Sequence, residues 1–233
     1  MRADPYEDYS QQVTRQLDLH YRPFSQRDVP IAWQPINDFV RAIIYKGLPM
    51  GLWVEIGCGV GSLIGDLAAK YPKQQCYGFD YSYQMLRVAQ DYWRATKPVE
   101  WLSMRGFGYC SVSARPSISN VAFALAQADE LPLPPASAAF IMSSFLLDRL
   151  PVPDKAIAEW SRIQAPGGRL AIISPFNFQQ ARHWQQYFPP NKIVAVLQKH
   201  GYFEVSVTQL VVEETLDLAG SSIRKQKSQH ALR

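Results

Sequence analysis

The sequence predicts one α/β domain built on a mostly parallel sheet with helices on both faces. Three observations support this fold class. Apolar runs of strand length alternate with amphipathic helical patterns between residues 36 and 212. Each strand-like run is almost unbroken in its apolar character, as expected for strands that are buried on both faces. A length of 233 residues with 47% apolar residues suits a single domain with a substantial core.

The expected strands are short, and helices separate most of them. In chain order they cover residues 52–56, 75–80, 121–128, 139–145, 169–175 and 203–212. The segment "APGG", residues 165–168, is expected to form a turn directly before the fifth strand. Because parallel strands need crossover connections, the helices between them are expected to lie on the faces of the sheet.

The expected helices follow from apolar residues spaced three and four positions apart. They cover residues 36–48, 62–71, 82–96, 153–164 and 191–201. Pro153 and Asp154 are typical of a helix start, and Gly201 is typical of a helix C-terminus. These signals place helix boundaries between the strands, as an alternating α/β fold requires.

Three segments lie outside this alternation, within what we interpret as a single domain over 1–233. Residues 1–35 are polar and aromatic, and we expect one or two helices there, outside the core. Residues 98–119 form an irregular insertion before the third strand. The C-terminal run "IRKQKSQHALR" is expected to be a solvated tail.

Charge and cysteine content argue against several classes of protein. The 24 basic residues nearly balance the 20 acidic ones, so a net charge of +4 does not indicate a nucleic-acid partner. The N-terminus lacks the features of a signal peptide, and no apolar run approaches the roughly 18 residues of a membrane span. Cys58, Cys76 and Cys110 form neither a metal spacing nor an even disulfide set, which fits a reducing, cytoplasmic setting.

The most informative stretch is "VEIGCGVGSLIGDLA", Val54–Ala68, where a strand is followed by a glycine-rich turn and a helix. Its glycines are Gly57, Gly59 and Gly61. Such a turn lets backbone N–H groups and the helix N-terminus approach a ligand closely. The dinucleotide pattern G-x-G-x-x-G would need a third glycine where Ser62 stands. The carboxylate of Glu55 beside this loop would attract a cationic ligand and repel a pyrophosphate.

A second acid follows the next strand. Asp80 ends the run "QCYGFD" and lies 19 residues after Gly61, where an acid can bind both hydroxyls of a ribose. Dinucleotide-binding proteins use an acid there too, so Asp80 indicates a ribose without choosing the cofactor. The alternative is a surface acid that caps the next helix. Met85 could pack on an adenine or simply belong to the core.

Together these residues resemble motif I of the class I S-adenosylmethionine (SAM) methyltransferases. The stretch "AQADELPLPPASAAFIMSSFLLDRLPVPDKAIAEWSRIQAPGGRLAIISP" is similar to small-molecule methyltransferases related to the ubiquinone and menaquinone C-methyltransferases. The resemblance covers about residues 38–205. It implies a Rossmann-like class I methyltransferase fold and SAM as the cofactor. It also implies transfer of the methyl group to a small-molecule acceptor by in-line displacement.

The resemblance further implies a set of cofactor-binding residues. They are Glu55, Gly57, Cys58, Gly59, Gly61, Asp80, Tyr81, Met85, Gln127, Ala128, Asp129 and Ser144. Alignment on the pair Leu131-Pro132 places Gln127 at the position that binds the adenine amino group. Ala128 is then the residue whose backbone N–H meets the adenine ring. A register shift would give the role of Gln127 to Asp129, and both alternatives stay open.

Methyl transfer from a sulfonium depends mainly on alignment of the acceptor with the methyl group. A general base is needed only if the nucleophile must lose a proton. Asp148, just past the fourth strand, and His183, after the fifth, are candidate catalytic residues. The competing interpretations are an ion pair of Asp148 with Arg149 or a helix-start acid, and a packing role for His183.

The acceptor is expected to be small and enclosed. "SSFL" stands where amino-directed base methylases carry an Asn/Asp-Pro-Pro-aromatic signature, so nucleic acid is disfavoured. The alternatives are a methyltransferase on RNA or protein, and a SAM-fold or dinucleotide-binding subunit without activity. The aromatic residues of segment 1–35 are expected to close over the acceptor, and deletion of 1–25 to spare folding. These residues are Tyr6, Tyr9, Tyr21 and Phe24. The 98–119 insertion is expected to form a homodimer contact instead.

Overall fold

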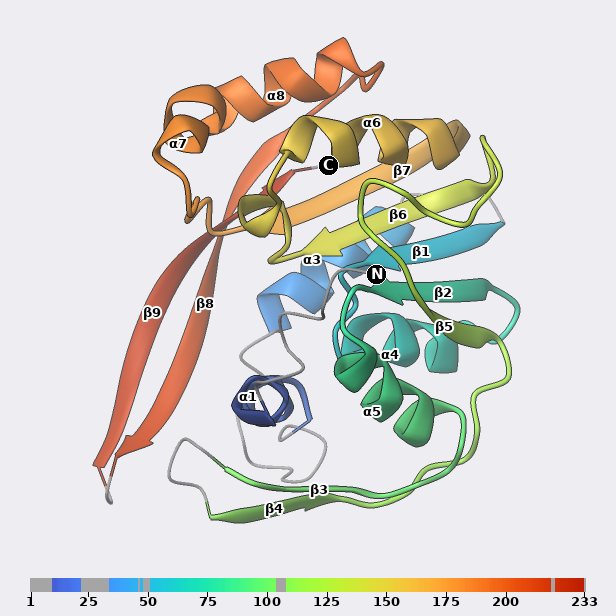
Figure 1. Cartoon of the computed structure of the whole chain (residues 1–233), viewed down its shortest axis with the longest axis vertical. Coiled ribbons are helices and arrows are strands. Elements are labelled where there is room, and N and C mark those ends of the chain that lie inside the picture. The colour runs from blue at the N-terminus through green and yellow to red at the C-terminus, as the bar shows by residue number, and fades with distance from the viewer. Residues whose placement is uncertain are drawn as a thin grey trace.

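The protein is described from a computed structural model, which covers residues 10–21, 34–45, 47, 51–103, 108–218 and 221–232. Its centre is a seven-stranded sheet in the order β5-β2-β1-β6-β7-β9-β8 (Figure 1). The strands are β1 (Leu52–Ile56), β2 (Gln75–Asp80), β5 (Val121–Leu125), β6 (Ala138–Ser144), β7 (Gln164–Ser174), β8 (Val207–Leu218) and β9 (Ser221–Leu232). The first five strands in this order are parallel, and β9 runs antiparallel to both β7 and β8. The predicted mostly parallel sheet is confirmed.

Helices cover both faces of the sheet, as predicted. One face carries α1 (Ser10–His20), α3 (Gln34–Tyr45), α4 (Ser62–Lys70) and α5 (Tyr83–Trp93). The other carries α6 (Pro153–Ile163), α7 (Ala181–Tyr187) and α8 (Pro190–Lys199) (Figure 1). Each face has its own buried apolar cluster, because the strand side chains alternate between the two faces. Helix α7 was not among the predicted elements.

The strand order reverses direction at the boundary between β1 and β6. From β1 the chain moves outward through β2 to β5, and it then returns to β6 on the other side of β1. In open α/β sheets, ligands bind at the carboxyl ends of the strands at such a switch point. The loops that follow β1, β2, β5 and β6 therefore define the edge at which a site is expected.

The strand that follows α6 begins earlier than predicted. Segment 165–168 was expected to be a separate turn, but it is part of β7. Ala138 pairs with Gln164, whereas Phe140 pairs with Arg169, so the extra residues of β7 bulge out between these two pairs. A bulge of this kind absorbs additional residues without ending the strand.

The C-terminal segment was predicted to be a solvated tail, and this prediction is wrong. Residues 221–232 form β9, which pairs with β8 along its whole length and with β7 through residues 230–232. The reason is that backbone hydrogen bonds to β7 and β8 hold β9 in place, and a polar sequence is compatible with an antiparallel strand.

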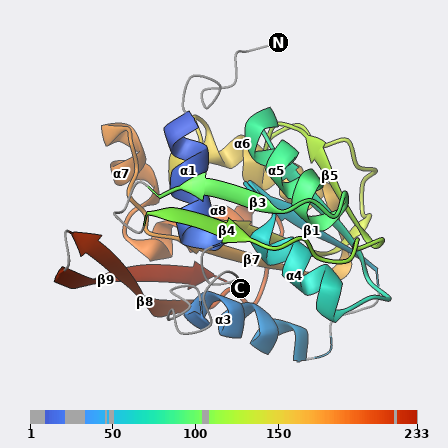
Figure 2. The same cartoon turned by 90° about the horizontal axis from the view of Figure 1, so that it is seen from below.

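Two further segments are more ordered than the sequence suggested. The 98–119 insertion contains a separate antiparallel hairpin of β3 (Val99–Leu102) and β4 (Tyr109–Val112). Helix α1 was expected outside the core, but Leu17 and the following Tyr21 belong to the buried cluster. Figure 2 shows β3 and β4 passing beside α1, and β3 is in contact with α1. Within the described part of the chain, no helix has the length and apolar character needed to span a membrane.

Candidate cofactor site

The glycine loop after β1 adopts a backbone conformation that favours glycine. The φ angles of Gly57, Gly59 and Gly61 are 76°, 53° and 73°. A Cβ atom at Gly57 would lie 3.0 Å from Leu146, and one at Gly61 would lie 2.6 Å from Phe123. At Gly59 a Cβ atom would meet nothing within 4 Å. The outer glycines thus allow close packing, while Gly59 faces open space that a ligand could fill.

Asp80 is in direct contact with this loop. Its Oδ2 accepts a hydrogen bond from the N–H of Gly59 at 2.7 Å, and its Oδ1 accepts from the N–H of Ser82 at 2.8 Å. The cap of α5 is Ser82, whose hydroxyl accepts from the N–H of Met85. Asp80 is therefore not the helix cap. Because each carboxylate oxygen has two lone pairs, Asp80 keeps the capacity to accept from ribose hydroxyls.

Glu55 lies beneath the loop in a buried position, with 4% of its surface exposed. Its Oε2 accepts from the N–H of Ile64, in the first turn of α4, at 3.0 Å. Burial raises the pKa of Glu55 to about 8, and the nearby charge of Asp80 adds to this effect. Burial and the same two carboxyl groups also raise the pKa of the Cys58 thiol. The site is thus acidic in character, which suits a sulfonium and an ammonium better than a phosphate.

The segment after β5 lies beside Asp80. Leu125, the last residue of β5, is the register partner of Asp80, and the N–H of Ala126 donates to the Asp80 carbonyl at 3.0 Å. Gln127 then forms a bridge with Glu130, which closes a tight turn. The turn is therefore held at the sheet edge, next to the acid that would bind a ribose.

The position of this turn leaves both adenine-binding alternatives open. The Ala128 carbonyl accepts from Trp160 Nε1 at 3.0 Å, which ties the turn to α6. The side chains of Gln127 and Asp129 are both exposed. Which of the two meets an adenine stays a prediction. Tyr81 is half-buried, whereas Met85 is 3% exposed and part of the core cluster, in line with its packing alternative.

The end of β6 carries features that the sequence did not reveal. Phe145 has a φ of 59°, which is rare for a bulky residue and is found most often at functional sites. The hydroxyls of Ser143 and Ser144 are buried, and neither has a hydrogen-bond partner among the described residues. Leu146 then packs against Gly57. Ser144, a predicted cofactor residue, thus offers an unused polar atom at the switch point.

Asp148 and His183, the candidate catalytic residues, are both buried, and both make contacts that hold the structure together. Asp148 accepts from the Ser174 hydroxyl at 3.0 Å and from the N–H of Asn177 at 3.1 Å, so it joins the end of β6 to the end of β7. His183 packs edge-on against the rings of Phe178 and other aromatic residues, and burial lowers its pKa. Their catalytic roles stay predictions.

Helix α1 reaches the glycine loop, as the predicted N-terminal cover requires. The Tyr21 hydroxyl donates to the carbonyl of Val60 at 2.7 Å, and Tyr21 is fully buried. His20 Nδ1 lies 2.9 Å from Ser62 Oγ, a contact that sequence reasoning missed because no local pattern indicates it. The other aromatic residues predicted for the cover lie outside the described residues: Tyr6, Tyr9 and Phe24.

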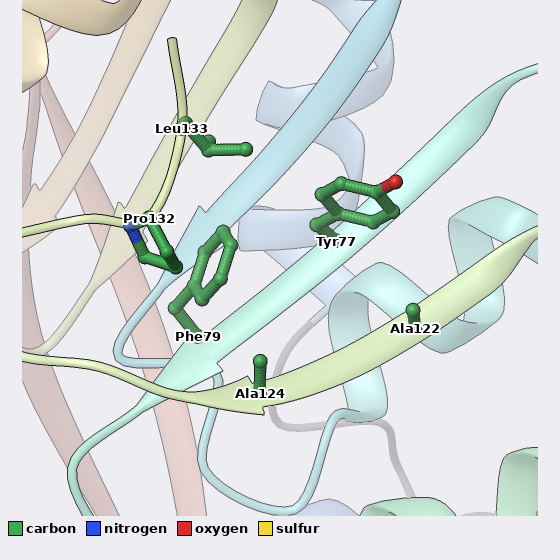
Figure 3. A pocket seen from close by; sticks show the side chains of 6 residues that line it. All are labelled: Tyr77, Phe79, Ala122, Ala124, Pro132 and Leu133. Carbon is green, nitrogen blue, oxygen red and sulfur yellow. The ribbon is translucent and has the colours of Figure 1, made fainter.

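A separate apolar pocket of about 220 Å³ lies over β2 and β5 (Figure 3). It is lined by Tyr77, Phe79, Ala122, Ala124, Pro132 and Leu133. The side chains of Tyr77 and Phe79 belong to the opposite face of β2 from Cys76, which packs in the cluster with α4 and α5. The pocket contains no carboxylate, so it lacks the groups that a sulfonium cofactor needs.

Comparison with known proteins identifies the family. A family profile described as "Methyltransferase domain" matches residues 54–172. The chain belongs to this methyltransferase family. The matched region includes the glycine loop, both acids and the end of β6. The chain therefore contains a SAM-dependent methyltransferase domain with a Rossmann-like fold.

Relatives and solved structures agree with this assignment. The chain is 27% identical to the malonyl-[acyl-carrier protein] O-methyltransferase of Methylococcus capsulatus over 136 residues, 58% of this chain and 42% of that protein. The match thus spans less than half of that relative's length.

Two solved structures share the fold at 18% identity. A SAM-dependent methyltransferase of Thermotoga maritima, described as a possible histamine N-methyltransferase, has a TM-score of 0.59 and covers 97% of this chain and 96% of its own. Phosphoethanolamine N-methyltransferase 2 of Haemonchus contortus, in complex with SAM, also has a TM-score of 0.59 and covers 89% of this chain and 46% of its own.

Proposed function

We propose that this methyltransferase modifies a small-molecule acceptor, which binds at the carboxyl ends of β1 and β6 beneath helix α1. The observation that carries this proposal is the position of α1 against the glycine loop, fastened by the Tyr21–Val60 hydrogen bond. A helix of the same chain in this position encloses the sheet edge. An enclosed edge favours a small acceptor over an RNA or a folded protein.

The described residues suit the cofactor that the family uses. When bound, SAM supplies an activated methyl group on its sulfonium. Glu55 provides a carboxyl group beneath the loop, whose charged form a cationic ligand would stabilise, and Asp80 provides oxygens for the ribose. Gln127 is our preferred partner for the adenine amino group, with Asp129 as the alternative. The residues of this chain therefore bind and orient, which is the main requirement of methyl transfer.

The acceptor side of the proposed site begins at Ser144. Its buried hydroxyl can donate or accept one hydrogen bond that no described residue supplies. Tyr21 is fully buried and covers the loop at Val60. Asp148 holds the two strand ends in register, and it remains a candidate base only for an acceptor that must lose a proton.

The names of similar proteins support an acceptor of this class without identifying it. These names specify phosphoethanolamine, a malonyl group on an acyl-carrier protein, and, for the protein described as a possible histamine N-methyltransferase, histamine. The resemblance to the quinone C-methyltransferases, a cytoplasmic location and a homodimer stay predictions for this chain.

The proposal is tested with the purified full chain, radiolabelled SAM, and panels of small amines, phenols and carboxylic acids. Bulk RNA and a protein mixture serve as competing acceptor classes. We expect label in a small-molecule product, with Asp80→Ala losing most of the activity. Asp66→Asn should keep it, because Asp66 is a half-buried acid on α4 whose ion-pair partner is Lys70. Label that enters only RNA or protein would overturn the proposal.

The structure revises the deletion experiment that the sequence suggested. Removal of residues 1–25 would take Leu17 and Tyr21 out of the buried cluster, so folding would not be spared. Tyr21→Phe is the sharper probe, because it removes one hydroxyl and keeps the ring. A Tyr21→Phe protein that methylates its acceptor at the full rate with wild-type SAM affinity would argue against the cover.

A further inference from the structure

The β3–β4 hairpin is joined to helix α1 by a buried polar contact. Trp101 on β3 donates from Nε1 to Asp18 Oδ1 at 2.6 Å, and the two residues are 5% exposed. Figure 2 shows the hairpin crossing α1. A buried carboxylate is costly without partners, so this hydrogen bond favours one position of α1 relative to the hairpin.

The hairpin is itself anchored on the main domain. The guanidinium of Arg115 lies over the ring of Trp93 on α5, 4.3 Å from its centroid. Arg94, directly after α5, donates from Nη1 to the carbonyls of Ile118 and Ser119. The insertion is therefore held at its C-terminal end by α5, and β3 can act as a fixed support for α1.

The same end of α1 also contacts the glycine loop. Asp18, His20 and Tyr21 lie within one helical turn of each other, so their relative positions are set by the helix. His20 meets Ser62, and Tyr21 donates to the Val60 carbonyl. The edge of the Tyr21 ring also packs against Tyr92, with ring centroids 4.8 Å apart. One helical turn thus connects the hairpin to the glycine loop.

We propose that Trp101 and Asp18 are positioning residues for the cofactor, acting through α1 on the glycine loop. Trp101 lies on the hairpin rather than on the loop. Loss of its hydrogen bond loosens α1 and weakens the hold of Tyr21 on Val60, next to the Gly59 amide that Asp80 binds. The hairpin therefore helps to set cofactor affinity. Its role as an oligomer contact stays a separate prediction, and the proposed role in positioning the cofactor holds whatever the acceptor is.

The first test measures binding of S-adenosylhomocysteine, the demethylated cofactor, to full-length variants by calorimetry. Trp101→Phe removes the Nε1–H donor, and Tyr21→Phe removes the hydroxyl. Tyr109→Phe is the matched control, since Tyr109 is on the same hairpin but 66% exposed, with its hydroxyl on Glu100. We expect about three- to tenfold weaker binding for the first two variants and no change for the control.

A double variant separates positioning from general destabilisation. Because both hydrogen bonds act through α1, Trp101→Phe with Tyr21→Phe should weaken binding by less than the product of the two single effects. All affinities are measured where circular dichroism shows each variant folded. Wild-type affinity in Trp101→Phe, or effects that multiply fully in the double variant, would overturn the proposal.

Hydrogen exchange is measured first on the wild-type protein, where the result does not depend on whether a variant folds. Addition of S-adenosylhomocysteine should slow exchange in residues 57–62, in α1 and in β3 together. In Trp101→Phe, exchange in 57–62 should be faster than in wild type before ligand is added. Protection confined to 57–62, with β3 unchanged, would show that the hairpin is not coupled to the loop.

Discussion

At the scale of single residues, the acidic pair beside the glycine loop determines what the site can bind. Glu55 is buried beneath the loop, and its carboxyl group is held largely protonated near neutral pH because burial disfavours its charge. A cationic ligand reverses this preference, because it stabilises the charged form. Asp80 shares the site and orients the Gly59 amide. The same two carboxyl groups thus favour a cation and disfavour a phosphate.

This arrangement predicts that SAM binding depends on pH through Glu55. Below its pKa of about 8 the free carboxyl is protonated, and binding of a cation releases the proton. SAM affinity should therefore rise with pH, by at most about tenfold per unit, and level off above pH 8. Calorimetry across this range, in buffers of different ionisation enthalpy, measures both the affinity and the proton release.

The matched variant for this prediction is Glu55→Gln, which keeps the shape and removes the titration. Its SAM affinity should be lower and independent of pH. Because S-adenosylhomocysteine lacks the sulfonium charge, its affinity should fall less than that of SAM. Proton uptake on binding, or an unchanged pH profile in the variant, would contradict the role given to Glu55.

A second prediction at this scale concerns the turn after β5. Gln127 lies two residues past the register partner of Asp80, and its amide oxygen can accept from an adenine amino group. Gln127→Ala should weaken binding of S-adenosylhomocysteine by about 1 kcal/mol, and more than Asp129→Ala does. Paired titrations check this order, and the reverse order would show that Asp129 has the role.

At the scale of secondary-structure elements, helix α1 acts as part of the site rather than as an appendage. Its last residue, His20, makes the loop contact, and the following residue, Tyr21, belongs to the core. Burial lowers the pKa of His20 to about 4, so this contact is made by the neutral imidazole. The folded protein therefore resists protonation of a group that titrates freely in the unfolded chain, near pH 6.5.

Burial of His20 makes the stability of the folded protein depend on pH between about 4 and 6.5. Between pH 6.5 and pH 4 the unfolded chain binds the His20 proton and the folded chain does not, so stability falls as pH falls. The loss is at most about 1.4 kcal/mol per pH unit. Urea unfolding of wild type and of His20→Gln isolates this effect, because Glu55 titrates in both proteins. A stability difference that stays constant from pH 7 to pH 4.5 would contradict the prediction.

At the scale of the whole molecule, cofactor binding and folding are coupled through the loop. The glycine loop contacts β2, α1 and the end of β6, so a ligand held there stabilises elements from distant parts of the sequence. A ligand that binds only the folded state at about 100 times its dissociation constant stabilises it by about 2.7 kcal/mol. The effect is therefore large enough to be seen in global unfolding.

We predict that S-adenosylhomocysteine raises the midpoint of thermal unfolding and that NAD does not. Gly59→Val should abolish this shift, because a side chain there enters the open space at the loop and strains a backbone with φ of 53°. Gly201→Val is the matched control, since Gly201 also has a positive φ and open surroundings but lies just after His200, the C-cap of α8. Equal stabilisation by NAD would contradict the assignment of the loop.

The sequence by itself determined the parallel part of the sheet, the glycine loop and the acids beside it. These features are local, because apolar periodicity, glycine spacing and a strand-end acid are readable within a short window. Strands β1, β2, β5, β6 and β7, together with Asp80 beside Gly59, follow from such patterns. The alternation of strands and helices was enough to predict a sheet covered on both faces.

Only the tertiary structure decided the parts that depend on contacts between distant residues. The pairing of β9 with β7 and β8 rests on backbone hydrogen bonds that any polar strand can form. The contact of Trp101 with Asp18 joins residues 83 positions apart, and that of Tyr21 with Val60 joins residues 39 apart. No local pattern encodes such pairs, because the energy that selects them comes from the burial of both partners in the folded chain.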